Sequence, residues 1–134
     1  MMARGLIVVA ALGLAACETG PARSFDDPAV QKLFTMSTPE YYATLTLAQR
    51  VTQGCDAYNY DAALDLQLNE ARNEVGRGSL AALSQRNAIE LETDVAKRSF
   101  EVKHSVNVST DNLCAAGDAE VLEGTALSAM LIPV

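Results

Sequence analysis

An apolar run at the start of the chain decides which residues are available to fold. Leu6–Ala16 is a stretch of eleven apolar or small residues that follows one positive charge, Arg4, and ends at Cys17. A membrane-spanning helix needs about 20 such residues, so this run is too short to be one. Its length and its basic start are typical of a signal peptide. We therefore expect residues 1–16 to be removed and the mature protein to begin at residue 17.

The end of that run, Leu14-Ala15-Ala16-Cys17, resembles the lipobox of bacterial lipoproteins. In that family a dedicated peptidase cuts before the cysteine, which carries three acyl chains, palmitate among them. The resemblance implies a lasting membrane anchor on Cys17, because one acyl chain alone binds a membrane only marginally. Glu18, the next residue, implies export to the outer membrane under the enteric sorting pattern, in which an Asp would retain the protein in the inner membrane. The alternative is a plain secretory signal cut after Ala15 or Ala16.

Composition limits the partners of the mature chain, residues 17–134, which has the size of one small domain. It holds nine Lys and Arg against seventeen Asp and Glu, a net charge of −8 once Arg4 has left with the leader. This balance argues against nucleic acid or an anionic lipid surface as a partner. Trp is absent and only seven residues are aromatic. The chain is therefore poorly suited to form a sugar-binding groove or an aromatic cage.

The cysteines predict a covalent link within the domain. Lipid on Cys17 leaves Cys55 and Cys114 as an even pair, and an exported protein meets an oxidising compartment. We predict a disulfide between them, which would close a loop of about 60 residues and stabilise the fold by up to about 4 kcal/mol. Two separate buried thiols are the alternative.

The spacing of apolar residues favours helices. Ser37-Thr38-Pro39-Glu40 predicts a capped helix start, and that helix should run to near Gly54. Further helices are expected over about 60–75, from Ser79 to about Lys103, and from Thr110 to about Leu122. Residues 100–108 alternate as a strand would, but a lone strand has no partner, so we predict that the helix ends near Lys103 and an extended linker follows over 105–109. The residues expected on the buried faces are Leu64, Leu68, Ala71, Val75, Leu80, Leu83, Ala88, Leu91, Val95 and Val121.

These elements predict an all-α fold, a small bundle of about four helices over residues 37–134 stapled by one disulfide. A flexible tether over residues 17–36 should precede it, with a short turn near Ala29–Phe34 docking onto the domain through Leu33 and Phe34. The apolar tail Ala126–Ile132 is too short to span a bilayer and is expected in the core.

The second half of the pattern resembles a group of small exported alphaproteobacterial proteins of unknown function. The likeness is carried by Cys55, two following helices, and Leu113-Cys114-Ala115-Ala116-Gly117-Asp118-Ala119-Glu120-Val121 with Gly124-Thr125. It covers about residues 50–131, implies an all-helical domain with the same disulfide, and brings no known activity. Gly117, one turn after Cys114, should let another helix approach closely.

Few residues suggest chemistry. His104 is the single histidine, and we interpret it as a surface or helix-end residue because no metal or catalytic motif surrounds it. Asp56, Asp61 and Asp65 are interpreted as a solvated acidic face, with a weak cation site as the alternative. Tyr58 and Tyr60 either form a small contact patch or pack at a helix junction.

Catalytic motifs are missing from the sequence. The candidate serines Ser79, Ser84 and Ser99 lack a GxSxG elbow, and the sequence contains no phosphate loop or dinucleotide fingerprint. We therefore expect no enzyme, no catalytic residue, no metal, and no cofactor beyond the lipid on Cys17. Two functional classes remain: a lipid-anchored envelope protein that binds another protein, and a lipoprotein that binds a small ligand or cation.

Overall fold

The computed structural model describes residues 20–134, and this part of the chain is mostly helical, as predicted. The predicted signal peptide over residues 1–16, and the predicted lipid-attachment residue Cys17 with Glu18, lie outside the described residues. The elements are α1 (Pro28–Thr35), α2 (Thr38–Gln53), β1 (Tyr58–Tyr60), α3 (Ala62–Glu74), α4 (Ser79–Ser84), α5 (Arg86–His104), α6 (Cys114–Glu123), the 3-10 helix η1 (Leu127–Met130) and β2 (Leu131–Pro133). Six α-helices are present in this range, so the predicted bundle of about four is not confirmed. Within residues 20–134 no helix combines the length and apolar character needed to cross a membrane.

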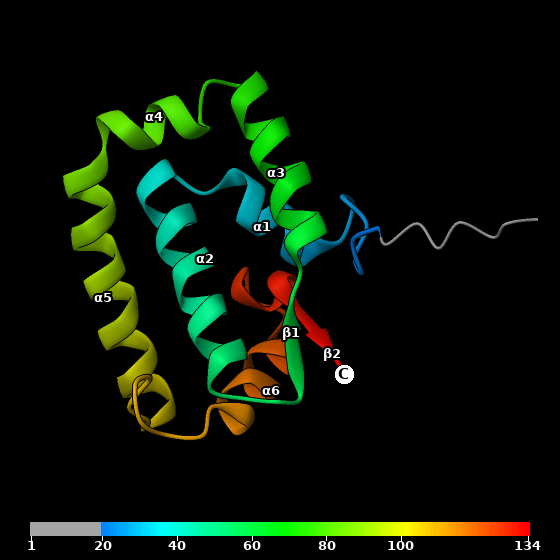
Figure 1. Cartoon of the computed structure of the whole chain (residues 1–134), viewed down its shortest axis with the longest axis vertical. Coiled ribbons are helices and arrows are strands. Elements are labelled where there is room, and N and C mark those ends of the chain that lie inside the picture. The colour runs from blue at the N-terminus through cyan, green and yellow to red at the C-terminus, as the bar shows by residue number, and fades with distance from the viewer. Residues whose placement is uncertain (1–19) are drawn as a thin grey trace, which may run out of the picture.

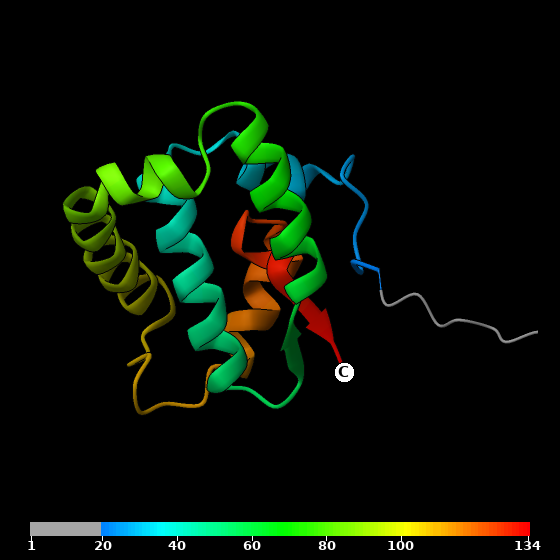
Figure 2. The same cartoon turned by 45° about the horizontal axis from the view of Figure 1, so that its top comes forward.

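Helix α2 lies at the centre of the molecule. In Figures 1 and 2 it runs between α5 on one side and α3 on the other, and the short α4 connects these two across one end. Its predicted capping box is present: Ser37 Oγ accepts the backbone N–H of Glu40, and the Glu40 carboxylate accepts the N–H of Ser37 at 3.2 Å. Its buried side chains include Tyr41, Leu45 and Val51.

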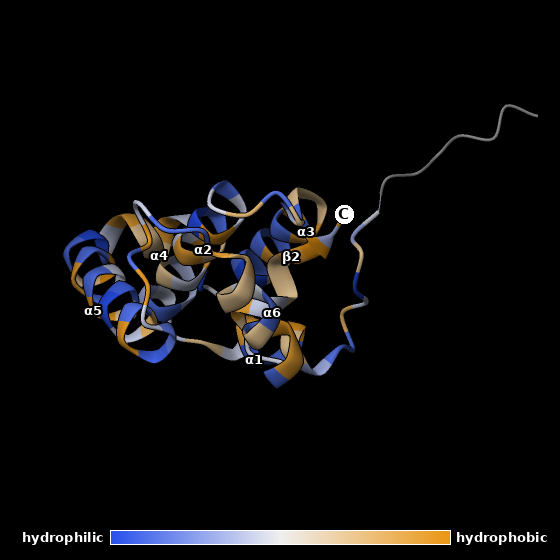
Figure 3. Ribbon diagram, turned by 90° about the horizontal axis from the view of Figure 1, so that it is seen from below, coloured by the Kyte–Doolittle hydropathy of each residue, from blue (hydrophilic) through white to orange (hydrophobic). Residues whose placement is uncertain are grey.

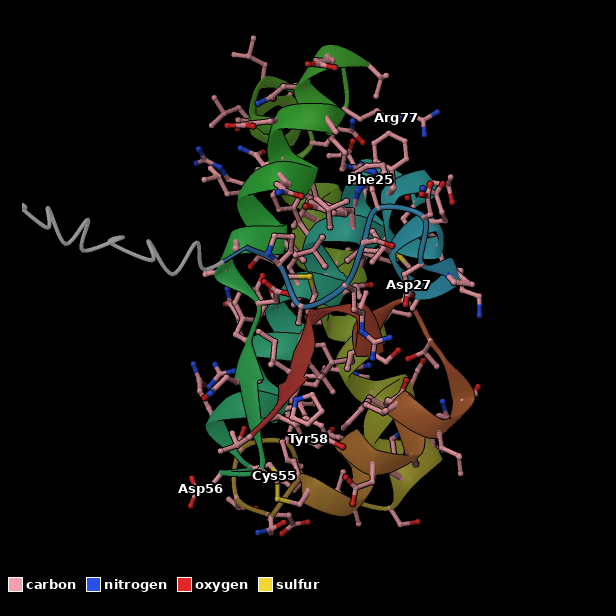
Figure 4. All side chains as sticks on the ribbon, turned by 90° about the vertical axis from the view of Figure 1, so that its right-hand side faces the viewer. Phe25, Asp27, Cys55, Asp56, Tyr58 and Arg77 are labelled. Atoms are coloured by element: carbon pink, nitrogen blue, oxygen red, sulfur yellow. A yellow bond between two sulfur atoms is a disulfide. The ribbon has the colours of Figure 1, made fainter. Side chains whose placement is uncertain are left out.

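The predicted disulfide between Cys55 and Cys114 is present, with 4.9 Å between the two Cα atoms. It joins the end of α2 to the start of α6. Gly117 permits the close approach that we expected, because a Cβ atom there would lie only 3.0 Å from Cε2 of Tyr58 and 3.2 Å from Cγ1 of Val51. In Figure 4, Cys55 and Tyr58 lie together at one end of the molecule.

The tether prediction needs correction, because residues 28–35 form α1. Ala29, Val30 and Leu33 are buried in the same core as α2, and Phe34 packs against it. Asp27 caps α1 by accepting the N–H of Ala29 at 2.8 Å. The docking expected of Leu33 and Phe34 is therefore confirmed, but as part of a full helix and not of a short turn.

The predicted third helix is wrong in two respects. It divides at Gln85 into α4 and α5, and the apolar face that we expected to be buried is exposed. The exposed fractions are 83% for Leu80, 63% for Leu83, 68% for Leu91 and 48% for Val95, and Ala88 is also exposed. The other face of α5 packs on α2 through Ala96 and the buried Phe100. Periodicity identifies an apolar face of a helix but does not show what covers it.

Smaller differences concern the other residues that we expected on buried helix faces. Leu64 and Leu68 are fully buried, as predicted, while Ala71 and Val121 are half-buried and Val75 is 57% exposed. The second helix begins at Ala62, because Tyr58–Tyr60 instead forms β1.

Strand β1 pairs antiparallel with β2, so that Tyr58 faces Pro133 and Tyr60 faces Leu131. We had not predicted this two-stranded sheet. The apolar tail that supplies β2 is buried over Ala126–Leu131, as expected of a core segment. Helix α5 ends at His104, where Ser105 takes a left-handed conformation with φ 54°, so the expected end of the helix is confirmed. The linker expected to be extended over 105–109 instead contains turns at Ser105 and at residues 108–110.

Candidate functional site

Two features of the described surface are candidates for function: a groove beside a buried carboxylate, Glu120, and an exposed apolar face of α5. Glu120 lies on α6 and is 4% exposed. Its Oε1 atom accepts Lys103 Nζ at 2.8 Å and lies 2.6 Å from His104 Nε2. Its Oε2 atom accepts the hydroxyl of Thr125 at 2.5 Å. These contacts join the end of α5 to α6 and to the segment that follows it.

The electrostatics of this cluster favour an ionised carboxylate. Burial raises the pKa of Glu120, but hydrogen bonds from Lys103, Thr125 and His104 together outweigh it, and the pKa lies below its ordinary value. The hydrogen bonds from Lys103 to Glu120 and Glu123 hold the pKa of Lys103 above its ordinary value. At neutral pH the cluster is therefore an ion pair with further hydrogen bonds.

His104 is a helix-end residue, as we interpreted it, but its side chain is only 8% exposed. Its ring lies 4.5 Å from the ring of Phe100, measured between centroids. The surface interpretation is therefore wrong: the imidazole is held between an aromatic ring and the Glu120 carboxylate.

A groove of about 230 Å³ lies beside this cluster, between α2, α5 and η1. Phe100, Leu47 and Met36 supply part of its apolar lining, and Lys103, Glu120 and Thr125 lie at its polar side. Both oxygens of Glu120 already accept hydrogen bonds from this chain. The arrangement therefore serves to hold α5 and α6 together and leaves mainly apolar surface in the groove.

The three aspartates of the predicted acidic face have separate roles. Asp61 is 1% exposed and caps α3 by accepting the N–H of Leu64 at 2.9 Å. Its other oxygen accepts the N–H of Ala22 at 2.9 Å. Asp65 accepts the hydroxyl of Tyr60, and Asp56 is exposed. The solvated-face interpretation is thus wrong for Asp61, and nowhere in residues 20–134 do three acidic, histidine or cysteine side chains gather as a metal site.

The tyrosines and serines also take structural positions. Tyr58 is buried and donates its hydroxyl to Asp118 at 2.5 Å. It therefore packs at the junction of β1 and α6 and does not form a contact patch. Ser84 donates its hydroxyl to the carbonyl of Ala81, and Ser79 donates to Asn69 at 3.4 Å. Ser99 borders the groove.

The second candidate is an apolar face on the outer side of α5, which we call the outer stripe: Leu91, Val95 and Val102. These residues recur at intervals of four and seven, which places them on one helix face. Val102 is 81% exposed and Leu91 68%. Figure 3 shows α5 at the edge of the molecule, with apolar segments between hydrophilic ones. Among the described residues, nothing covers this face.

Comparisons with protein-family models, with curated proteins and with solved structures found no match for this chain.

Proposed function

We propose that this chain is a non-catalytic interaction protein of the bacterial cell envelope. Lipid on Cys17 would hold it at a membrane, and the outer stripe of α5 would bind its protein partner. The lipobox-like sequence Leu14–Cys17 supports the anchor, and Glu18 favours the outer membrane. The domain then faces the periplasm, where its disulfide is stable.

The observation that carries this proposal is the exposure of the outer stripe. Single exposed apolar residues are common, but contiguous apolar faces on small soluble domains tend to mark binding sites. Fully burying one Leu or Val side chain contributes about 1.5–3 kcal/mol, so covering Leu91, Val95 and Val102 would drive association. Because the opposite face of α5 packs on α2, the stripe is presented by a fixed helix.

A small apolar ligand in the groove beside Glu120 is the second candidate. Its apolar lining favours such a ligand, but about 230 Å³ is below the range typical of ligand sites. The groove is also open to solvent and not an enclosed cavity. The outer stripe is therefore the better supported surface.

The test is a pull-down of the tagged, lipidated protein from its native membrane, followed by mass spectrometry. Leu91→Lys should abolish the capture of the partner that the parent chain retains. The matched control is Leu66→Lys, since Leu66 is also exposed, at 61%. Leu66 belongs to α3, which lies across α2 from α5 (Figure 1). Loss of the same partner from both variants, or from neither, would show that the stripe is not the binding surface.

A further inference from the structure

We propose that the partner of the outer stripe is a second copy of this chain, paired through α5 in an antiparallel, two-fold symmetric arrangement. The inference rests on the proposed function, because it names the partner of that same surface. Three properties of α5 carry it: the spacing of its outer residues, the distribution of its charges, and two charged side chains, Asp94 and Arg98, that form no ion pair within the described part of the chain.

The outer residues of α5 follow the spacing of a coiled-coil seam. Apolar positions that alternate at intervals of three and four residues form a stripe along which two helices pack. In α5 these positions are Ala88, Leu91, Val95, Arg98 and Val102. Four of the five are apolar. The helix is nineteen residues long, about 28 Å at 1.5 Å per residue, which is enough for two heptads.

The charges of α5 are divided along its length. Its first half, residues 86–95, holds three carboxylates, Glu90, Glu92 and Asp94, against one guanidinium. Its second half, residues 96–104, holds three basic side chains against one carboxylate. Lys103 already pairs with Glu120 and Glu123, which leaves Lys97 and Arg98 for a partner. An antiparallel pair places each acidic half against a basic half, whereas a parallel pair would oppose like charges. The helix is therefore complementary to itself in one orientation only.

The central residues define the register. When two antiparallel copies are centred near Ala96, Asp94 of one helix lies opposite Arg98 of the other. Leu91 then lies near Val102 of the second copy. Two-fold symmetry repeats each contact, as it does in every such interface. Neither Asp94 nor Arg98 forms an ion pair anywhere in the part of the chain that the structure describes. Both are therefore available to the second copy.

Cysteine cross-linking in the native membrane tests the pairing on the full chain. Val95 lies near the proposed two-fold axis, so Val95→Cys should form a disulfide-linked dimer of this chain under mild oxidation. Leu66→Cys on α3 is the control for random collision, and its yield of disulfide-linked dimer should be at least about tenfold lower. An equal yield from both variants overturns the dimer. An adduct of Val95→Cys with a different protein also overturns it, but leaves the proposed function standing.

Charge exchange tests the antiparallel orientation. Asp94→Arg places two arginines together at each of the two symmetric contacts, and should raise the dissociation constant of the dimer by about tenfold. Arg98→Asp should have a similar effect, and the double variant Asp94→Arg/Arg98→Asp should restore cross-linking at Val95→Cys. A foreign partner would not be rescued by the double exchange. Both residues are exposed, so circular dichroism should show the same helix content in every variant, and failure of the double variant to restore the dimer overturns the proposed orientation.

Discussion

The guanidinium of Arg72 lies over the ring of Tyr41, with 4.1 Å between Cζ and the ring centroid. Arg72 is fully buried, and its Nη1 atom donates to the carbonyl oxygens of Phe34, at 2.6 Å, and Met36, at 3.0 Å. These carbonyls lie at the end of α1 and in its connection to α2. One side chain of α3 thus holds the end of α1 against the start of α2. Burial lowers the pKa of Arg72, but an arginine begins so high that it remains charged.

Arg72→Met should reduce the free energy of unfolding by about 2–4 kcal/mol, because it removes two charge-assisted hydrogen bonds and a buried cation–π contact. Arg72→Lys should recover only part of this loss, since an ammonium group lacks the planar fork. Urea unfolding followed by circular dichroism measures both. The control is Arg77→Met, at an exposed arginine just beyond α3. Equal stabilities for the two methionine variants would show that Arg72 contributes nothing specific.

Reduction of the Cys55–Cys114 bond should lower the melting temperature markedly. The bond spans 59 residues, and the entropy of the open loop in the unfolded chain gives a contribution of up to about 4 kcal/mol. The double variant Cys55→Ala/Cys114→Ala should melt at the same low temperature with and without reductant. Intact-mass measurement after alkylation under denaturing, non-reducing conditions checks the bond itself. Alkylation of both thiols without reductant would contradict it.

Features set by neighbouring residues were predictable from the sequence. The capping box of Ser37 and Glu40 depends on four consecutive residues, and the end of α5 near His104 depends on the pattern around it. The Cys55–Cys114 bond was predicted from two considerations: the number of cysteines left once Cys17 is assigned to lipid, and the oxidising compartment expected of an exported protein. In each case the chemistry leaves few alternatives, so sequence reasoning was sufficient.

Features set by distant contacts were missed. Nothing near Arg72 in the sequence indicates that it binds carbonyls 36 and 38 residues earlier. Glu120 has its partners 16 and 17 residues away on another helix, and Tyr58–Tyr60 finds its strand partner at the far end of the chain. The short Pro28–Thr35 segment is a helix capped by Asp27, and its buried face packs mainly against η1 near the far end of the chain. Long-range packing decides such cases, and a single sequence does not display it.

Glu120→Gln should destabilise the domain at pH 7 by about 1–3 kcal/mol, because it removes the charge that Lys103 pairs with in a buried setting. The folded state holds the pKa of Glu120 below the ordinary value of 4.5. Its contribution is therefore fully present above that pH and is lost as the pH falls through the folded pKa. Stability measured from pH 7 to pH 2 should fall less in the variant than in the parent chain. Identical pH profiles would contradict the role of this carboxylate.

Cys17→Ser should stop processing of the leader and leave a larger precursor in the membrane, because the peptidase of the lipoprotein family acts on a lipidated cysteine. Metabolic labelling with a fatty acid should mark the parent chain and not the variant. Cys114→Ser serves as the control, since it should keep its label despite losing the disulfide. A Cys17→Ser protein that is still cut and becomes soluble would point to the plain secretory signal.

Leu68 and Leu91 were both expected on buried helix faces, but the structure buries only one of them. Leu68 is fully buried, whereas Leu91 is 68% exposed. Leu68→Asp puts a carboxylate in the core without a partner, so the folded state should be lost or destabilised by more than about 4 kcal/mol. Leu91→Asp should change stability by less than about 0.5 kcal/mol, as surface substitutions do.

Circular dichroism and urea unfolding of both variants, at concentrations low enough to exclude self-association, measure this difference. Loss of helix in Leu68→Asp with an intact spectrum in Leu91→Asp is the expected result. Since the two substitutions are chemically identical, only burial distinguishes them. A large loss of stability in Leu91→Asp would mean that α5 turns its outer stripe inward in solution, and that stripe could then not be a binding surface.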